Sequence, residues 1–182
     1  MDIRSEGIRP KPKPKVVLGI DPGSRFAGFG LLLESGMNWQ HLESGVIRLK
    51  TNQILPDRLL ELSLALHSLY DKYRPDLTVV EKVFLGKNVD SAFTLGHARG
   101  VVLLEAARSG SEIREYAARS VKKSVTGYGA ADKVQVQNFL KSLLGVPSFE
   151  RDDASDALAL ALHGARLWKS ENQLRAGRVE FQ

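Results

Sequence analysis

The first part of the chain alternates short apolar runs with turn sequences. Residues 16–20 form an apolar run that ends at the tetrapeptide Asp-Pro-Gly-Ser of 21–24, and apolar and glycine residues resume over 26–33. Such a tetrapeptide between two apolar runs is typical of a turn, so we predict a β-hairpin. A third strand is expected at about 41–49, after a second turn at Ser35-Gly36.

A helical pattern follows the three strands. Apolar residues recur at spacings of three and four between residues 56 and 73, and Pro56 suits the first turn of a helix. These apolar positions are Leu59, Leu62, Leu66, Leu69 and Tyr73. Arg74-Pro75 ends the helix, and residues 77–83 are β-rich. Strand, helix and strand in succession predict a crossover that makes the strand at 77–83 parallel to the first strand.

The rest of the chain predicts mostly helices. They are expected at about 90–108, 119–126, 132–144 and 153–168, with a short strand at 113–116. The fold class is therefore α/β, with a five-stranded mixed sheet flanked by helices. We expect one domain over 15–168, after a flexible basic Lys/Pro arm at 1–14 and before a polar basic C-terminal tail at 169–182 that frays.

Composition supports this picture and excludes several classes of protein. The 182 residues are 43% hydrophobic and 26% charged, which fits one globular domain rather than a disordered chain. The longest apolar runs are far shorter than the roughly 20 residues of a membrane span. Cysteine is absent, which excludes disulfides, thiolate zinc sites and a cysteine nucleophile. The N-terminal residues lack the apolar region of a secretory signal, so we expect a cytoplasmic protein.

The net charge of +5 is weak evidence for a nucleic-acid partner. Five basic and two acidic residues lie within 1–15, so the rest of the chain carries only +2. Taken alone, such an excess is better explained by a solvated, soluble surface.

Two acidic residues stand near the ends of strands that we predict to be parallel neighbours. Asp21 follows the first strand, and Glu81 lies near the end of the strand at 77–83. Ligands and catalytic groups of open α/β sheets gather at the carboxyl ends of strands, so the two carboxylates can meet there. Taken singly, Asp21 is also an ordinary turn residue, and Glu81 also fits an exposed strand face.

A second acidic group opens the last predicted helix. Asp153 and Asp156 are three residues apart, which places them on neighbouring parts of one helix face, and Asp156 borders the face that looks toward the sheet. Asp152 lies four residues before Asp156 and is not excluded by helix geometry. Acidic residues at a helix start also serve as caps and favour the macrodipole, which is the plainer explanation.

If these four carboxylates converge, they need a cation between them, because bare negative charges repel one another. Oxygen donors, with no cysteine and only scattered histidines, favour Mg²⁺ or Mn²⁺ over structural zinc. The histidines are His41, His67, His97 and His163. Two such ions about 4 Å apart suit phosphodiester hydrolysis.

Six segments together carry a resemblance to a known family. They are Gly19-Ile20-Asp21-Pro22-Gly23-Ser24, Val80-Glu81-Lys82-Val83-Phe84, Lys87-Asn88-Val89-Asp90-Ser91-Ala92, Gly96-His97-Ala98-Arg99-Gly100, Tyr116-Ala117-Ala118-Arg119 and Asp153-Ala154-Ser155-Asp156-Ala157-Leu158. Their order and spacing over about 15–168 resemble the RuvC family of Holliday junction resolvases, which have a ribonuclease H-like fold. Each segment is weak evidence alone, but their joint occurrence is specific.

The resemblance implies a crossover junction endodeoxyribonuclease. It implies that Asp21, Glu81, Asp153 and Asp156 are the catalytic and metal-binding acids, and it selects Asp153 over Asp152. It further implies two Mg²⁺ or Mn²⁺ ions per site and a homodimer that places two active sites on a four-way junction. Such a dimer nicks two strands of like polarity and leaves ligatable 5′-phosphates. Family partners are the branch-migration proteins RuvA and RuvB.

The resemblance also implies DNA contacts. Phe84, with Lys87 and Asn88 in the same segment, matches a place where the family uses an aromatic residue, which we interpret as stacking on an unpaired base. Lys122 and Lys133 match family lysines that face DNA. A core phenylalanine and solvated helix lysines are the alternatives.

Other interpretations remain open from sequence alone. The Asp-Pro-Gly-Ser turn at 21–24 also resembles the phosphate loop of actin-like nucleotide-binding proteins, although the chain is too short for their two domains and has no Walker motif. A catalytically silent junction-binding protein is a third possibility, which the presence of all four acids disfavours. His163, two turns beyond Asp156, is expected to be satisfied locally within its helix rather than to approach a metal.

Overall fold

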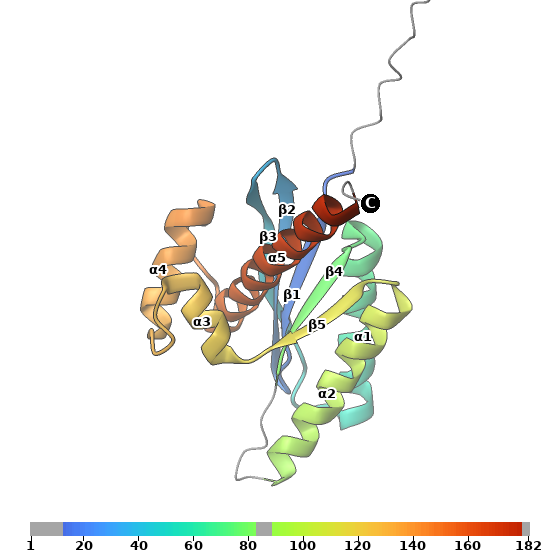
Figure 1. The fold of residues 1–182 in the computed structure, drawn as a ribbon. Helices are drawn as coiled ribbons and strands as arrows, with labels where there is room; N and C mark the ends of the chain where they lie inside the picture. The colour runs from blue at the N-terminus through green and yellow to red at the C-terminus, as the bar shows by residue number, and fades with distance from the viewer. Residues whose placement is uncertain (1–12, 83–88, 180–182) are drawn as a thin grey trace, which may run out of the picture.

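The computed structural model describes residues 13–82 and 89–179. Its elements follow one another in the predicted order (Figure 1). They are β1 (Val16–Asp21), β2 (Phe26–Ser35), β3 (Asn38–Arg48), α1 (Leu55–Tyr73), β4 (Leu77–Glu81), α2 (Val89–Arg108), β5 (Glu112–Tyr116), α3 (Ala118–Thr126), α4 (Lys133–Leu144) and α5 (Asp152–Val179).

The five strands form one mixed sheet, as the sequence predicted, and the structure places them in the order β3-β2-β1-β4-β5. Strands β1, β2 and β3 pair antiparallel, whereas β4 is parallel to β1 and β5 is parallel to β4. Ile20 of β1 is in register with Val80 of β4. The next residues, Asp21 and Glu81, are the last of their strands and therefore lie side by side at the carboxyl ends of β1 and β4.

Helices cover both faces of the sheet. Figure 1 shows α5 lying across one face with α3 and α4 beside it, while α1 and α2 cover the other face. Alternation along β1 supplies both cores: Val17 packs with residues of α3, α4 and α5, whereas Leu18 and Ile20 pack with residues of α1 and α2. None of the described helices combines the length and the apolar character needed to cross a membrane.

Glycines let α5 approach the sheet closely. A Cβ atom added to Gly28 of β2 would lie 1.9 Å from the carbonyl oxygen of Asp153, and one added to Gly19 of β1 would lie 2.0 Å from that of Ala157. Both distances are far below van der Waals contact, so any side chain at these positions would push the first turns of α5 away. The backbone contact therefore determines where the start of α5 lies.

The end of the chain differs from the prediction. We expected a frayed tail from residue 169, but α5 continues to Val179. Ion pairs hold its later turns to the sheet: Lys169 Nζ lies 2.9 Å from Glu34 Oε1, and Arg114 Nη1 lies 2.9 Å from Glu171 Oε2. Polar composition suggested a loose tail because these partners lie far away in the sequence. Residues 1–12 of the predicted basic arm lie outside the described residues.

Candidate metal-binding active site

Asp21 and Glu81 meet at the carboxyl edge of the sheet, and their side chains share a hydrogen bond. Each is the last residue of its strand. Arg99 of α2 fixes the second strand end, because its Nη1 donates to the carbonyl oxygen of Glu81 at 2.5 Å. The sequence motif that contains Arg99 did not reveal this structural role.

Helix α5 adds the other two predicted acids. Asp153 and Asp156 lie in its first turns, and the negative charges of both act on Asp21. The glycine contacts described above place this part of α5 against β1 and β2. The structure thus brings all four predicted acids into one region, although 132 residues separate Asp21 from Asp153.

The acids repel one another strongly. Burial raises the pKa of Asp21 to about 8, and the charges of Glu81, Asp156 and Asp153 add to that shift. Burial likewise raises the pKa of Glu81 and of Asp156. The protein by itself therefore leaves negative charge uncompensated here, and a cation at this place would relieve it.

Two basic side chains compensate part of this charge. Lys133 Nζ lies 3.5 Å from Asp156 Oδ2, and Arg151 Nε lies 3.0 Å from Asp153 Oδ2. The Arg151 guanidinium group also lies 3.8 Å from the ring centroid of Phe26. We assigned Arg151 no role from the sequence, although its place directly before two aspartates was a signal for an ion pair.

In this arrangement the carboxylates do not yet surround one point. Within residues 13–82 and 89–179, no three His, Asp or Glu side chains form a group that could hold a metal ion. Asp153 is engaged by Arg151 and Asp156 by Lys133, and all four side chains reach solvent. Four carboxylates are suited as ligands of a hard divalent cation, which would have to displace the two basic groups.

Asp152 occupies a different position from Asp153. Its carboxylate accepts a hydrogen bond from Gln137 Nε2 at 2.9 Å and lies 3.2 Å from Lys133 Nζ. The hydrogen bond from Lys133 holds the pKa of Asp152 below its usual value. The sequence left Asp152 open as an alternative to Asp153, whereas in the structure it is bonded to α4.

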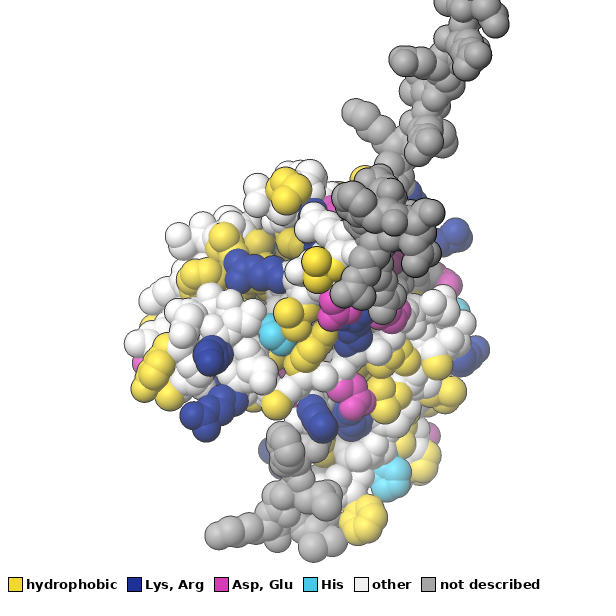
Figure 2. All heavy atoms as spheres, in the orientation of Figure 1, with side chains coloured by type: hydrophobic (Ala, Val, Ile, Leu, Met, Phe, Trp, Pro, Cys, Tyr) yellow, Lys and Arg dark blue, Asp and Glu magenta, His cyan; other side chains and the backbone are white. Residues whose placement is uncertain are grey.

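The predicted lysines lie beside the acids. Lys122 and Lys133 line a cleft of about 220 Å³ together with Glu81 and Asp156. Figure 2 shows the Lys and Arg side chains of one face in separate small groups rather than in one continuous field, in keeping with the modest net charge. The predicted contacts Phe84, Lys87 and Asn88 lie outside the described residues.

His163 is buried behind the cleft. It is only 6% exposed, and its ring meets that of Tyr116 edge-on with 4.5 Å between centroids. Burial, with the charge of Arg166, lowers its pKa. We expected the His163 ring nitrogens to form hydrogen bonds locally, within the helix. This is wrong for Nδ1, which has no hydrogen-bond partner among the described residues.

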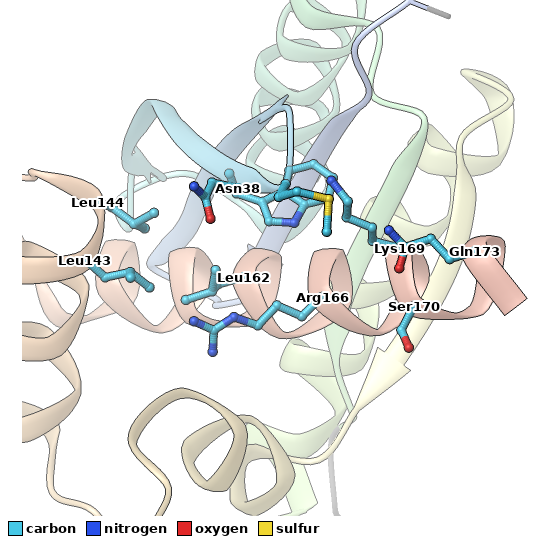
Figure 3. Close-up of a pocket in the computed structure, with 10 residues that line it drawn as sticks. Asn38, Leu143, Leu144, Leu162, Arg166, Lys169, Ser170 and Gln173 are labelled. Atoms are coloured by element: carbon cyan, nitrogen blue, oxygen red, sulfur yellow. The ribbon is translucent and has the colours of Figure 1, made fainter.

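A larger hollow of about 430 Å³ lies elsewhere on the molecule (Figure 3). Its walls come from the turn between β2 and β3, the end of α4 and the later turns of α5. Met37, Leu143 and Arg166 are among its lining residues, and no acidic side chain is. This hollow is therefore not suited to a divalent cation.

Comparison with known proteins shows the family to which the chain belongs. A family model described as "Crossover junction endodeoxyribonuclease RuvC" matches residues 17–163, which include all four acids. This chain belongs to the RuvC family. RuvC of Bdellovibrio bacteriovorus is 50% identical over 150 residues, covering 82% of this chain and 89% of that protein. RuvC of Marinobacter nauticus is 42% identical over 171 residues, covering 90% and 97%.

Solved structures of Holliday junction resolvases agree with the fold. Thermus thermophilus RuvC in complex with a Holliday junction substrate superposes with a TM-score of 0.77 at 28% identity, covering 83% of this chain and 93% of that one. The yeast mitochondrial Holliday junction resolvase Ydc2 has a TM-score of 0.65 at 15% identity, covering 94% and 89%. The ribonuclease H-like fold expected from the sequence is thus confirmed.

Proposed function

We propose that this RuvC-family nuclease resolves four-way DNA junctions by paired, symmetric phosphodiester nicks in recombination and repair. The observation that carries the proposal is the meeting of Asp21 and Glu81 with the acidic start of α5, where burial, with the charges of the neighbouring acids, raises the pKa of Asp21 to about 8. A site with this much uncompensated negative charge needs cations before it can accept a phosphodiester.

Asp21, Glu81, Asp153 and Asp156 would hold the cations, which we propose to be two Mg²⁺ or Mn²⁺ ions per site. When bound, these ions supply positive charge that polarises the scissile phosphate and lowers the pKa of a nearby water. Hydrolysis forms a bond between the water oxygen and phosphorus and breaks the P–O3′ bond, which leaves a 3′-hydroxyl and a 5′-phosphate.

The chain's own residues orient the DNA and set the protonation state of the site. Asp21 has to lose its proton before its carboxylate can act as a ligand. Lys122 and Lys133, on the wall of the same cleft, would contact the backbone phosphates on either side of the scissile bond. The segment with Phe84, Lys87 and Asn88 follows Glu81 directly in the chain, so we propose that it contacts unpaired bases at the junction centre.

We further propose a homodimer, because a four-way junction has two-fold symmetry and two nicks of like polarity need two sites. RuvA and RuvB would supply the migrating junction, and the protein would act in the cytoplasm.

The test is cleavage of a labelled synthetic four-way junction and of a plain duplex of the same sequence, with Mg²⁺, with Mn²⁺ and with a chelator. We expect paired nicks in the junction but not in the duplex, and only when Mg²⁺ or Mn²⁺ is present. In chelator the protein should bind the junction without nicking it. Junction binding without nicking under every cation condition would instead identify a silent junction-binding protein. Nucleotide hydrolysis without nicking would favour the actin-like interpretation.

A further inference from the structure

Lys133 forms ion pairs with two carboxylates, those of Asp152 and Asp156. Its Nζ lies 3.2 Å from Asp152 Oδ2 and 3.5 Å from Asp156 Oδ2. Asp156 is one of the four acids that would take a cation, whereas Asp152 is not. The same ammonium group therefore has one partner inside the site and one at its rim.

The Asp152 carboxylate is held in place from its other side. Gln137, one turn into α4, donates from Nε2 to Asp152 Oδ1 at 2.9 Å and to Ser155 Oγ at 3.2 Å. Ser155 Oγ in turn donates to the carbonyl oxygen of Asp152 at 2.7 Å. These bonds occupy Oδ1 and leave Oδ2 for Lys133.

The backbone at Lys133 is also fixed. It is the first residue of α4, directly after the capping residue Asp132, whose side chain accepts from the Gln135 amide in a capping box. Both the lysine and its outer partner therefore start from well-defined helix ends, and Asp152 is placed within reach of the Lys133 ammonium group.

A divalent cation on Asp156 changes the balance between these partners. The Asp156 oxygens would be occupied and the added positive charge would repel the ammonium group, so the contact between Lys133 and Asp156 is lost. Asp152 then remains as the one carboxylate already bonded to Lys133.

We propose that Asp152 is a positioning residue that holds Lys133 at the rim of the cleft, toward the DNA phosphate, once a cation has replaced Lys133 on Asp156. This inference rests on the proposed function of the site. Asp152 acts through Lys133 and touches neither the cation nor the DNA.

The first experiment measures Lys133 itself, without DNA and without turnover. An amine-acylating reagent, followed by peptide mass spectrometry, gives the labelling rate of Lys133 relative to Lys141 at the other end of α4. In the wild type the ion pair with Asp152 engages the ammonium group and protects it from acylation. With Mg²⁺ present, we expect Lys133 to be labelled about two- to fivefold faster in Asp152→Asn than in the wild type, the size of one exposed ion pair.

The matched control is Glu150→Gln, which removes an acid two residues away whose partner is Arg48. In this variant the reagent should label Lys133 at the wild-type rate. Labelling of Asp152→Asn at the wild-type rate in Mg²⁺ would overturn the proposal, as would equal acceleration in both variants, which would mean a general loss of negative charge.

The second experiment is a double-mutant cycle on the single-turnover nicking rate with saturating Mg²⁺. Asp152→Asn should lower the rate about three- to fivefold, the size of one exposed ion pair, and Asp152→Glu should restore most of it. General loss of an acid near DNA predicts the opposite sign, because it strengthens binding. In a Lys133→Ala background, Asp152→Asn should change the rate by less than about twofold, because the two residues act together.

Equal loss in both backgrounds would overturn the proposal, because Asp152 would then act on α5 or as a metal ligand. Complete loss of nicking in Asp152→Asn would likewise overturn it in favour of a ligand. Failure of the proposed function looks different: the wild type itself would not nick junctions, while the labelling experiment would still report on Asp152 and Lys133.

Discussion

The two helical layers contact the sheet in different ways. In the layer of α1 and α2, α1 packs through the large side chains of Leu62, Leu66 and Tyr70, which can repack when one of them changes. The start of α5 instead rests on Gly19 and Gly28, with backbone against backbone. Side-chain packing supplies stability with some tolerance, whereas the backbone contact leaves no room for adjustment. Asp153 and Asp156 lie on this backbone-packed side of the sheet, at the start of α5.

The largest expected effect comes from removing a carboxylate on that side. Asp21→Asn should lower the single-turnover nicking rate about a thousandfold, because metal-ion chemistry is worth several kcal/mol and each 1.36 kcal/mol is tenfold. Junction binding, measured by gel shift in chelator at pH 7, should stay about equal, because the metal-free Asp21 side chain is already protonated there and the substitution changes little charge. A variant that nicks at the wild-type rate would rule out Asp21 as a ligand.

The same variant should raise the melting temperature of the metal-free protein at pH 7. The pKa of Asp21 is about 8 when folded and near 3.8 when unfolded, so folding keeps a proton bound that unfolding releases. Stability is therefore lost as pH rises from about 4 to about 8, and Asp21→Asn removes this loss. The gain in melting temperature should shrink toward pH 4, which calorimetry at several pH values will test.

Gly28→Ala should have the next largest effect on rate. Its Cβ would meet the Asp153 carbonyl oxygen at 1.9 Å, so α5 has to move. A displacement of about 1 Å can cost about a hundredfold in rate, and overpacking costs about 1–3 kcal/mol of stability. The control is Gly45→Ala in β3, where a Cβ meets only the end of the Phe29 side chain at 3.0 Å. Equal nicking by both variants would show that the backbone contact does not position the acids.

The affinity for metal ions should rise with pH. Because Asp21 carries a proton below about pH 8, binding has to release it, and affinity rises with pH. The half-saturating Mn²⁺ concentration of the DNA-free protein, measured by calorimetry, should fall about tenfold per pH unit between about pH 6 and 8 and then level off. Asp21→Asn should flatten this dependence, and a flat profile in the wild type would contradict the assigned protonation state.

The smallest effect on the nicking rate is expected for a change in the layer of α1 and α2. Leu66→Ala deletes a fully buried side chain of α1 and should cost about 2–5 kcal/mol of unfolding free energy in denaturant titrations. Nicking well below the melting temperature should change by less than about twofold, because Leu66 packs in the core on the face of the sheet opposite α5 (Figure 1). A rate loss as large as that of Gly28→Ala would remove the distinction between the two layers.

Much of the arrangement was predictable because it depends on local pattern. Leucine spacing predicted α1, turn chemistry predicted the hairpin of β1 and β2, and a crossover between parallel strands placed Asp21 beside Glu81. The order of the acids along the chain, with the surrounding motifs, was enough to identify the family. The roles of the individual acids and of Lys122 and Lys133 stay predictions until variants are measured.

The sequence by itself determined the elements, the sheet and which acids to consider, because strand and helix periodicities and turn residues act over short distances. Only the tertiary structure decided that α5 continues beyond Trp168, that Gly28 lies under Asp153, and that Asp152 and Asp156 share Lys133. Each of these depends on contacts between segments distant in the chain, where a shift of about one ångström decides which charged groups meet.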